Sequence, residues 1–185
     1  MQFLKYIVLL CVFQSSLFAY HIDTYNPVRD KENVAALFIQ ERKVLELDEV
    51  LSGMEITLDQ LLTTYETGQM GPADAKMIVL FDDTNNFVGF CGYCVYEAYI
   101  NYEGQDSIEK QTKILSLAIK QEQRNKGYAS KLIEHMIEQA KTINVKEVNL
   151  LTSGNNIAAH HLYEKLGFSK SVLENSDIYY SMNLK

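Results

Sequence analysis

Hydrophobic positions follow two different periods along this chain, and the clearest helical period lies between residues 127 and 140. Six apolar side chains there recur at intervals of three and four residues, namely Ala129, Leu132, Ile133, Met136, Ile137 and Ala140. That spacing places them on one face of an amphipathic helix. The shorter apolar runs are rich in β-branched and aromatic residues and are typical of strands.

The remaining elements follow from the same periods and from the turn-forming residues between them. Strands are predicted at residues 21–28, 76–81, 87–100, 113–119, 145–152, 168–173 and 178–184. Further helices are predicted at 29–47, at 57–67 with Thr57 as N-cap, and at 156–166, with loops at 68–75 and 101–109. The order β-α-α-β-β-β-α-β-α-β-β indicates a single α/β (α+β) domain with a mixed sheet.

The first 19 residues differ from the rest of the chain. Lys5 precedes an unbroken apolar run at residues 6–13, and a short polar stretch follows it and ends at Ala19. This layout predicts a signal peptide at residues 1–19, with export of a domain spanning 20–185. Two alternatives stay open: an uncleaved membrane anchor, and a misassigned start codon that leaves a cytoplasmic protein.

Composition and charge limit the classes of molecule that this chain is expected to bind. Hydrophobic residues make up 47% of the 185 residues, charged residues 22%, and the net charge is −7. An acidic chain argues against non-specific binding of nucleic acid, which needs a basic surface.

Cys91 and Cys94 lie three apart in a predicted strand, so they point to opposite faces, and we expect neither a disulfide nor a metal site.

Positive charge gathers at one place, where a strand leads into the amphipathic helix. Residues 113–131 hold five basic side chains and one acidic one, Glu122; the basic set is Lys113, Lys120, Arg124, Lys126 and Lys131. A helix N-terminus presents unpaired N–H groups, and Gly127 lets a ligand approach the backbone closely. This combination favours a phosphate ligand, although a solvated charged face is the simpler alternative.

A second group of residues lies on the predicted helix at 156–166. Asn156, Ala159 and Tyr163 are spaced three and four apart and share one face. Tyr163 is placed to donate a proton to a ligand lying along that face; the alternative is a core tyrosine whose hydroxyl reaches the edge. His160 and His161 lack metal-ligand spacing and are expected at the surface or edge.

The two groups together resemble the GNAT superfamily of acetyl-CoA-dependent N-acetyltransferases. The family's pyrophosphate motif, Q/R-x-x-G-x-G/A, corresponds to residues 124–129, RNKGYA. Its second motif, N-x-x-A-x-x-L-Y-x-x-x-G-F, is matched at every fixed position: Asn156, Ala159, Leu162, Tyr163, Gly167 and Phe168. The specific match covers about residues 113–168.

The resemblance implies a role for each of these positions. The strand that ends at Leu117 and Ile119 should separate from its neighbour and bind the pantetheine arm through its backbone. The amides of Arg124, Asn125, Lys126, Gly127, Tyr128 and Ala129 should hold the pyrophosphate, and Asn156 should contact the cofactor arm. Tyr163 should protonate the leaving thiolate of acetyl-CoA.

The resemblance leaves the general base and the acceptor open. Some members carry a glutamate on the strand at 113–119, which has no acid here; Glu97 is the best substitute, and a water chain is the alternative. The predicted activity is N-acetylation of a primary amine by direct attack in a ternary complex. Aromatic and acidic residues of the long hairpin would suit a cationic amine, namely Tyr96, Tyr99, Tyr102, Glu103, Asp106 and Glu109.

A different class of function fits the same cofactor motifs. A domain that binds acyl-CoA without catalysis would serve as a sensor or interaction module, and the missing acid on the strand at 113–119 favours it. An exported protein would meet coenzyme A only inside another cell. The acceptor, the length of the acyl group and the oligomeric state are not specified by these motifs.

Overall fold

The computed structural model describes residues 20–44, 58–70, 73–102, 104–173 and 177–185. The N-terminal half contains β1 (Tyr20–Thr24), α1 (Pro27–Val44), α3 (Leu58–Thr67), β2 (Gln69–Met70), β3 (Ala73–Asp82) and β4 (Phe87–Tyr102). The C-terminal half contains β5 (Gln105–Ile119), a 3-10 turn at Gln121–Gln123, α4 (Tyr128–Thr142), β6 (Glu147–Ser153), α5 (Ile157–Lys165), β7 (Ser169–Val172) and β8 (Asp177–Asn183).

The strands form one mixed sheet in the order β1-β3-β4-β5-β6-β8-β7, with β2 paired to β3. Among the described strands, only β5 and β6 pair in parallel, and α4 connects them; the other pairs are antiparallel. The predicted mixed α/β architecture is therefore confirmed.

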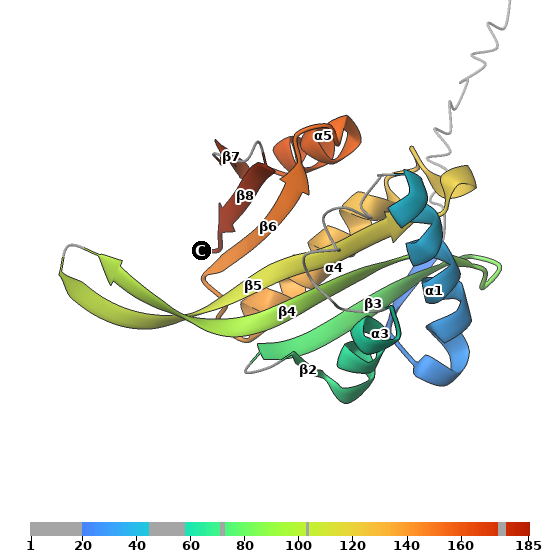
Figure 1. Cartoon of the computed structure of the whole chain (residues 1–185), viewed down its shortest axis with the longest axis horizontal. Coiled ribbons are helices and arrows are strands. Elements are labelled where there is room, and N and C mark those ends of the chain that lie inside the picture. The colour runs from blue at the N-terminus through green and yellow to red at the C-terminus, as the bar shows by residue number, and fades with distance from the viewer. Residues whose placement is uncertain (1–19, 45–57, 71–72, 103, 174–176) are drawn as a thin grey trace, which may run out of the picture.

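Helices cover both faces of this sheet (Figure 1). Helix α4 packs on one face, where Leu132, Ile133 and Met136 are fully buried in one core cluster. Helices α1 and α3 pack on the other face, where Val34, Leu37 and Leu62 belong to a second cluster. The apolar stripe predicted on residues 129–140 is the buried side of α4.

The predicted loop at 101–109 is wrong, because β4 and β5 continue through it as a two-stranded arm beyond the body of the molecule (Figure 1). Its polar composition is typical of loops, but alternate residues of each strand pair their N–H and C=O groups with the other strand. Tyr102 pairs with Gln105, and Gly104 at φ 81° makes the turn. Glu103 lies outside the described residues.

Two smaller boundaries also differ. Helix α1 begins at Pro27 and not at Arg29, since the Asn26 side chain accepts the Val28 N–H at 2.9 Å and caps the helix. The predicted loop at 68–75 contains β2 and the start of β3. Thr57 and the proposed signal peptide at 1–19 lie outside the described residues. Among those described, no helix is both long and apolar enough to cross a membrane.

Candidate functional site

The β5 and β6 strands part in the middle of the sheet. They pair only from Gln111–Glu147 to Ile114–Leu150, although β5 runs on to Ile119 and β6 to Ser153. The β4–β5 register skips Leu115 at the same point, which marks a β-bulge. We call the unpaired ends, residues 115–119 of β5 and 151–153 of β6, the fork; Figure 1 shows the two strands diverging there.

The fork leaves one edge of β5 without a partner strand. The Lys120 N–H donates to the Val88 carbonyl of β4 at 2.9 Å. Because alternate residues of a strand turn their N–H and C=O groups to opposite edges, Leu117 and Ile119 turn theirs away from β4. Those are the two residues predicted to bind the pantetheine arm. The Ile119 carbonyl is engaged here, since it accepts the Arg124 Nε–H at 3.1 Å.

The loop between β5 and α4 turns its backbone N–H groups outward. Asn125 at φ 61° and Gly127 at φ 82° are both left-handed, a conformation found in anion-binding loops. No side chain caps α4, and its first backbone bond runs from the Lys131 N–H to the Gly127 carbonyl. The N–H groups of Tyr128, Ala129 and Ser130 therefore lack helical acceptors. A Cβ added to Gly127 would meet nothing within 4 Å, so the backbone there is open to a ligand.

Arg124 is the exception among the predicted amides. Its N–H already donates to the Gln121 carbonyl at 3.3 Å, within the 3-10 turn. Its guanidinium pairs with Glu41 of α1. The expected amide contact from Arg124 is therefore already occupied, whereas residues 125–129 keep the predicted arrangement.

The basic side chains around this loop also have partners within the protein. Lys120 lies over the Phe87 ring at 5.4 Å, Lys126 donates to Gln123 at 2.7 Å, and Lys131 pairs with Glu134 at 3.3 Å. Backbone N–H groups are thus the anion-binding elements that remain free in this loop.

Helix α5 places the second predicted group on the other side of the fork. Asn156 is its N-cap, and its Oδ1 accepts the Ala159 N–H at 3.3 Å. Tyr163 is only 5% exposed and packs against Phe168 and Tyr180, with ring centroids 5.5 Å apart in each pair. Its hydroxyl has no hydrogen-bond partner among the described residues. Burial, and to a lesser extent nearby Cys91, raises the pKa of Tyr163 above its ordinary value, so the phenol stays protonated.

The predicted surface position of His160 is wrong. This side chain is buried, with Nδ1 3.1 Å from the Tyr180 hydroxyl and Nε2 3.0 Å from the Gly154 carbonyl. It links the start of α5 to β8. Cys91 and Cys94 lie on strand β4, as predicted, and both are free and buried; burial raises the pKa of the Cys91 thiol to about 12. Among the described residues, no group of His, Cys, Asp or Glu could hold a metal ion.

Glu97 lies apart from these residues. It is exposed on the arm, paired in register with Lys110 and five residues from Gly92. That separation is about 17 Å along a strand. Its position does not favour the base role, which stays a prediction.

The arm also divides the tyrosines predicted to bind the acceptor. Tyr96 and Tyr102 point to one face of the ribbon and Tyr99 to the other, because strand side chains alternate. Asp106 bonds to Tyr99 and Asn101 on that second face. These side chains therefore form no single aromatic and acidic pocket.

One polar network was not predicted from the sequence. Tyr96 donates to Gln111 at 2.8 Å and accepts from Asn149 at 3.0 Å. The Glu147 Oε1 accepts from Asn149 at 3.1 Å and from Tyr179 at 3.0 Å. Four strands contribute to it, so no local motif could have indicated it.

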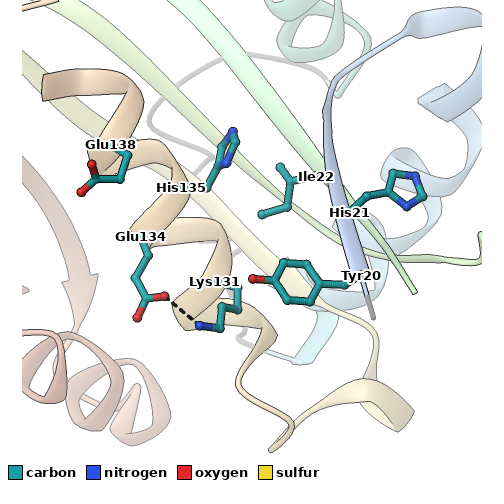
Figure 2. Close-up of a pocket in the computed structure, with 7 residues that line it drawn as sticks. All are labelled: Tyr20, His21, Ile22, Lys131, Glu134, His135 and Glu138. Atoms are coloured by element: carbon teal, nitrogen blue, oxygen red, sulfur yellow. Dashed lines mark hydrogen bonds and ion pairs between the residues drawn. The ribbon is translucent and has the colours of Figure 1, made fainter. Parts of the chain in front are cut away.

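A shallow polar groove lies between β1 and α4, on the opposite side of α4 from α5. Figure 2 shows the Tyr20 hydroxyl pointing toward Lys131 and Glu134, with His135 facing Ile22 across the groove. No residue of this groove belongs to the fork. Lys131, counted with the phosphate site in the sequence, points into this groove instead.

Comparison with known proteins agrees with the motifs. Residues 45–168 match the acetyltransferase (GNAT) family. An N-alpha-acetyltransferase from Saccharolobus solfataricus is 31% identical over 87 residues, which cover 46% of this chain and 52% of that protein. The chain thus spans about half the length of this curated relative.

Solved structures share the fold at low sequence identity. The PaiA N-acetyltransferase of Thermoplasma acidophilum, in complex with coenzyme A, aligns with a TM-score of 0.67 at 16% identity, over 90% of this chain and 99% of that one. Arabidopsis thaliana NAA60, in complex with acetyl-CoA, aligns with a TM-score of 0.62 at 14% identity, over 90% and 99%. A Staphylococcus aureus acetyltransferase aligns with 0.61 at 21% identity, over 90% and 100%.

Proposed function

Because the chain belongs to the acetyltransferase (GNAT) family, we propose that it transfers an acetyl group from acetyl-CoA to a primary amine by direct attack in a ternary complex. One observation carries this proposal. The fork opens beside the uncapped N-terminus of α4, and the buried Tyr163 side chain lies near Cys91, the register partner of Leu117 in the fork.

The chain's backbone offers matching groups for acetyl-CoA. The edge of β5 at Leu117 can pair with the amides of the pantetheine arm, as a neighbouring strand would. The N–H groups of residues 125–129 can hold the pyrophosphate at the α4 terminus. The Asn156 side chain already caps α5. Its contribution is therefore to fix the start of that helix beside the pantetheine arm.

The chemistry requires one proton donor and one proton acceptor. Acetyl-CoA supplies an activated acyl group: the amine nitrogen forms a bond to the carbonyl carbon, and the carbon–sulfur bond breaks. Tyr163 donates its proton to the departing thiolate, and the proton lost by the amine replaces it through water. The raised pKa of Tyr163 keeps the phenol protonated, and so ready to donate, at neutral pH.

A second candidate function is a non-catalytic acyl-CoA-binding module. The observation that favours it is the lack of any acid on residues 113–119 of β5, beside the fork. An amine that is already neutral can attack without a carboxylate there to act as general base. Acetyl transfer therefore stays the main proposal.

The test is Tyr163→Phe, with CoA release measured against a panel of primary amines. We expect kcat to fall by about 100-fold, a typical value for loss of a general acid, while the acetyl-CoA Kd changes less than about threefold. A parent protein that binds acetyl-CoA but releases no CoA with any amine would favour the binding module.

The exported location also remains a proposal, supported by the composition of residues 1–19. N-terminal sequencing of protein from fractionated cells tests it, with a mature chain beginning at Tyr20 expected. A chain that keeps Met1 in the soluble fraction would contradict export. If export is correct, the protein meets acetyl-CoA only where another cell supplies it.

A further inference from the structure

Two buried hydroxyls face each other close to the fork and have no other hydrogen-bond partner among the described residues. Tyr65 of α3 is 7% exposed, and its hydroxyl lies beside the Ser116 Oγ of β5, a contact that lowers the pKa of Tyr65 by less than burial raises it. A hydroxyl can make more than one hydrogen bond, so each of these two buried oxygens keeps unused hydrogen-bonding capacity. A ligand held between them would use that capacity on both.

Gly92 of β4 makes the space in which both hydroxyls lie. A Cβ added there would stand 2.3 Å from the Tyr65 hydroxyl oxygen and 2.6 Å from the Ser116 Oγ. Gly92 pairs in register with Ser116, which directly follows the bulged Leu115. The two hydroxyls therefore meet at the point where the fork begins.

The pair approaches the fork from the face opposite Tyr163. Tyr65 belongs to the core cluster under α1 and α3, and Tyr163 belongs to the cluster under α4 (Figure 1). Tyr163 lies near Cys91, which pairs with Leu117, on the rung next to Gly92 and Ser116. A group held between the two faces at the fork would thus have a proton donor on one side and two hydroxyls on the other.

We propose that the Tyr65 and Ser116 hydroxyl oxygens form the binding site for the acceptor's amine nitrogen. This inference rests on the proposed function. A neutral primary amine has two N–H groups and one lone pair. When both N–H groups donate to Tyr65 and Ser116, the lone pair points away from them, toward the fork and the acetyl carbon. The geometry therefore selects primary amines over secondary ones.

The hydroxyls position the amine and do not deprotonate it. Burial raises the pKa of Tyr65 above its ordinary value, so Tyr65 stays a phenol at neutral pH. The other described hydroxyls that are buried and unpartnered belong to Tyr25 and Thr112. Tyr25 follows β1, which two strands separate from β5, and Thr112 precedes the parting on β5. Tyr25 is therefore a matched control.

The experiment compares Tyr65→Phe, Ser116→Ala and the control Tyr25→Phe in the full chain. For Tyr65→Phe and Ser116→Ala, we expect kcat/KM for a primary amine to fall by about tenfold or more, the usual effect of losing a substrate hydrogen bond. Their preference for that amine over its N-methyl derivative should shrink, and the acetyl-CoA Kd should stay within about twofold. Tyr25→Phe should keep wild-type kinetics. Both Tyr→Phe changes should lower Tm little, because Tyr25→Phe removes an unpartnered hydroxyl and Tyr65→Phe removes only its contact with Ser116.

The outcomes separate the two proposals. An active wild type with unchanged kinetics in Tyr65→Phe overturns this inference alone, as does an equal loss of acetyl-CoA affinity. A Tm loss without a kinetic effect would assign Tyr65 to packing. A wild type that binds acetyl-CoA and acetylates no primary amine overturns the proposed function, and this inference with it.

Discussion

The proposed cofactor site and the proposed acceptor site differ in the groups that form them. The proposed cofactor site uses backbone groups, namely the free edge of β5 and the N–H groups at Gly127. The proposed acceptor site uses side chains from distant positions, because Tyr65 of α3 meets Ser116 of β5 across Gly92. Backbone sites need particular residues at fixed spacing and leave a motif; side-chain sites built across the fold do not.

The free energy of unfolding should depend on the core and little on the β4–β5 arm. Two alanine substitutions, one in each region, should show the largest difference. Leu132→Ala removes a fully buried side chain of α4 and should cost about 3 kcal/mol. Ile108→Ala removes an exposed side chain of the arm and should cost less than about 0.5 kcal/mol. Urea unfolding measures both. Equal losses would show that the arm packs against something in solution.

Backbone recognition of the cofactor can be tested with two glycines of the same conformation. Gly127 at φ 82° and Gly104 at φ 81° both have open space around them, so alanine should cost each about 1 kcal/mol of stability. Only Gly127→Ala should weaken acetyl-CoA binding, by about 2 kcal/mol or roughly 30-fold in Kd. Calorimetric titration gives the Kd. An equal effect of Gly104→Ala would contradict a specific phosphate site at α4.

Alkaline pH should destabilise the core cluster under α4. Burial raises the pKa of Cys91 and of Tyr93 to about 12, from 9.0 and 10.0. The unfolded chain ionises these groups first, so their contribution to stability is complete below pH 9 and is lost as pH rises toward 12. The slope is about 1.4 kcal/mol per pH unit for each group. Unfolding curves at pH 8 to 11 measure it, and a flat profile would show that these groups are open to solvent.

Breaking the ion pair between Arg124 and Glu41 should give the smallest change in acetyl-CoA binding. Arg124 of the phosphate loop pairs with Glu41 of α1 near the surface, and such pairs contribute about 0.2–1 kcal/mol. Glu41→Gln leaves the Arg124 charge unpaired beside the loop, so acetyl-CoA should bind about twofold more tightly at low salt. The gain should vanish in high salt because of screening. Weaker binding would instead show that α1 must anchor Arg124.

Errors in the sequence-based predictions fall mainly where local composition and the tertiary environment disagree. The polar residues 101–109 resemble a loop, but cross-strand pairing makes them an arm. His160 is a polar residue without metal-ligand spacing, but it is buried because Tyr180 of β8 packs against it. Glu97 lies on the long strand before residues 113–119, and its register places it on the arm; its role as general base stays a prediction.

The sequence by itself determined the mixed α/β order and the amphipathic α4, because helix periodicity depends on neighbouring residues. It also singled out the loop before α4 and Tyr163 as candidate site residues, each through a short local motif. The tertiary structure alone decided that β5 and β6 part at Leu115, that Arg124 is held by Glu41, and that Tyr65 and Ser116 meet at Gly92. Those contacts join residues many positions apart, so only strand register and helix packing bring them together.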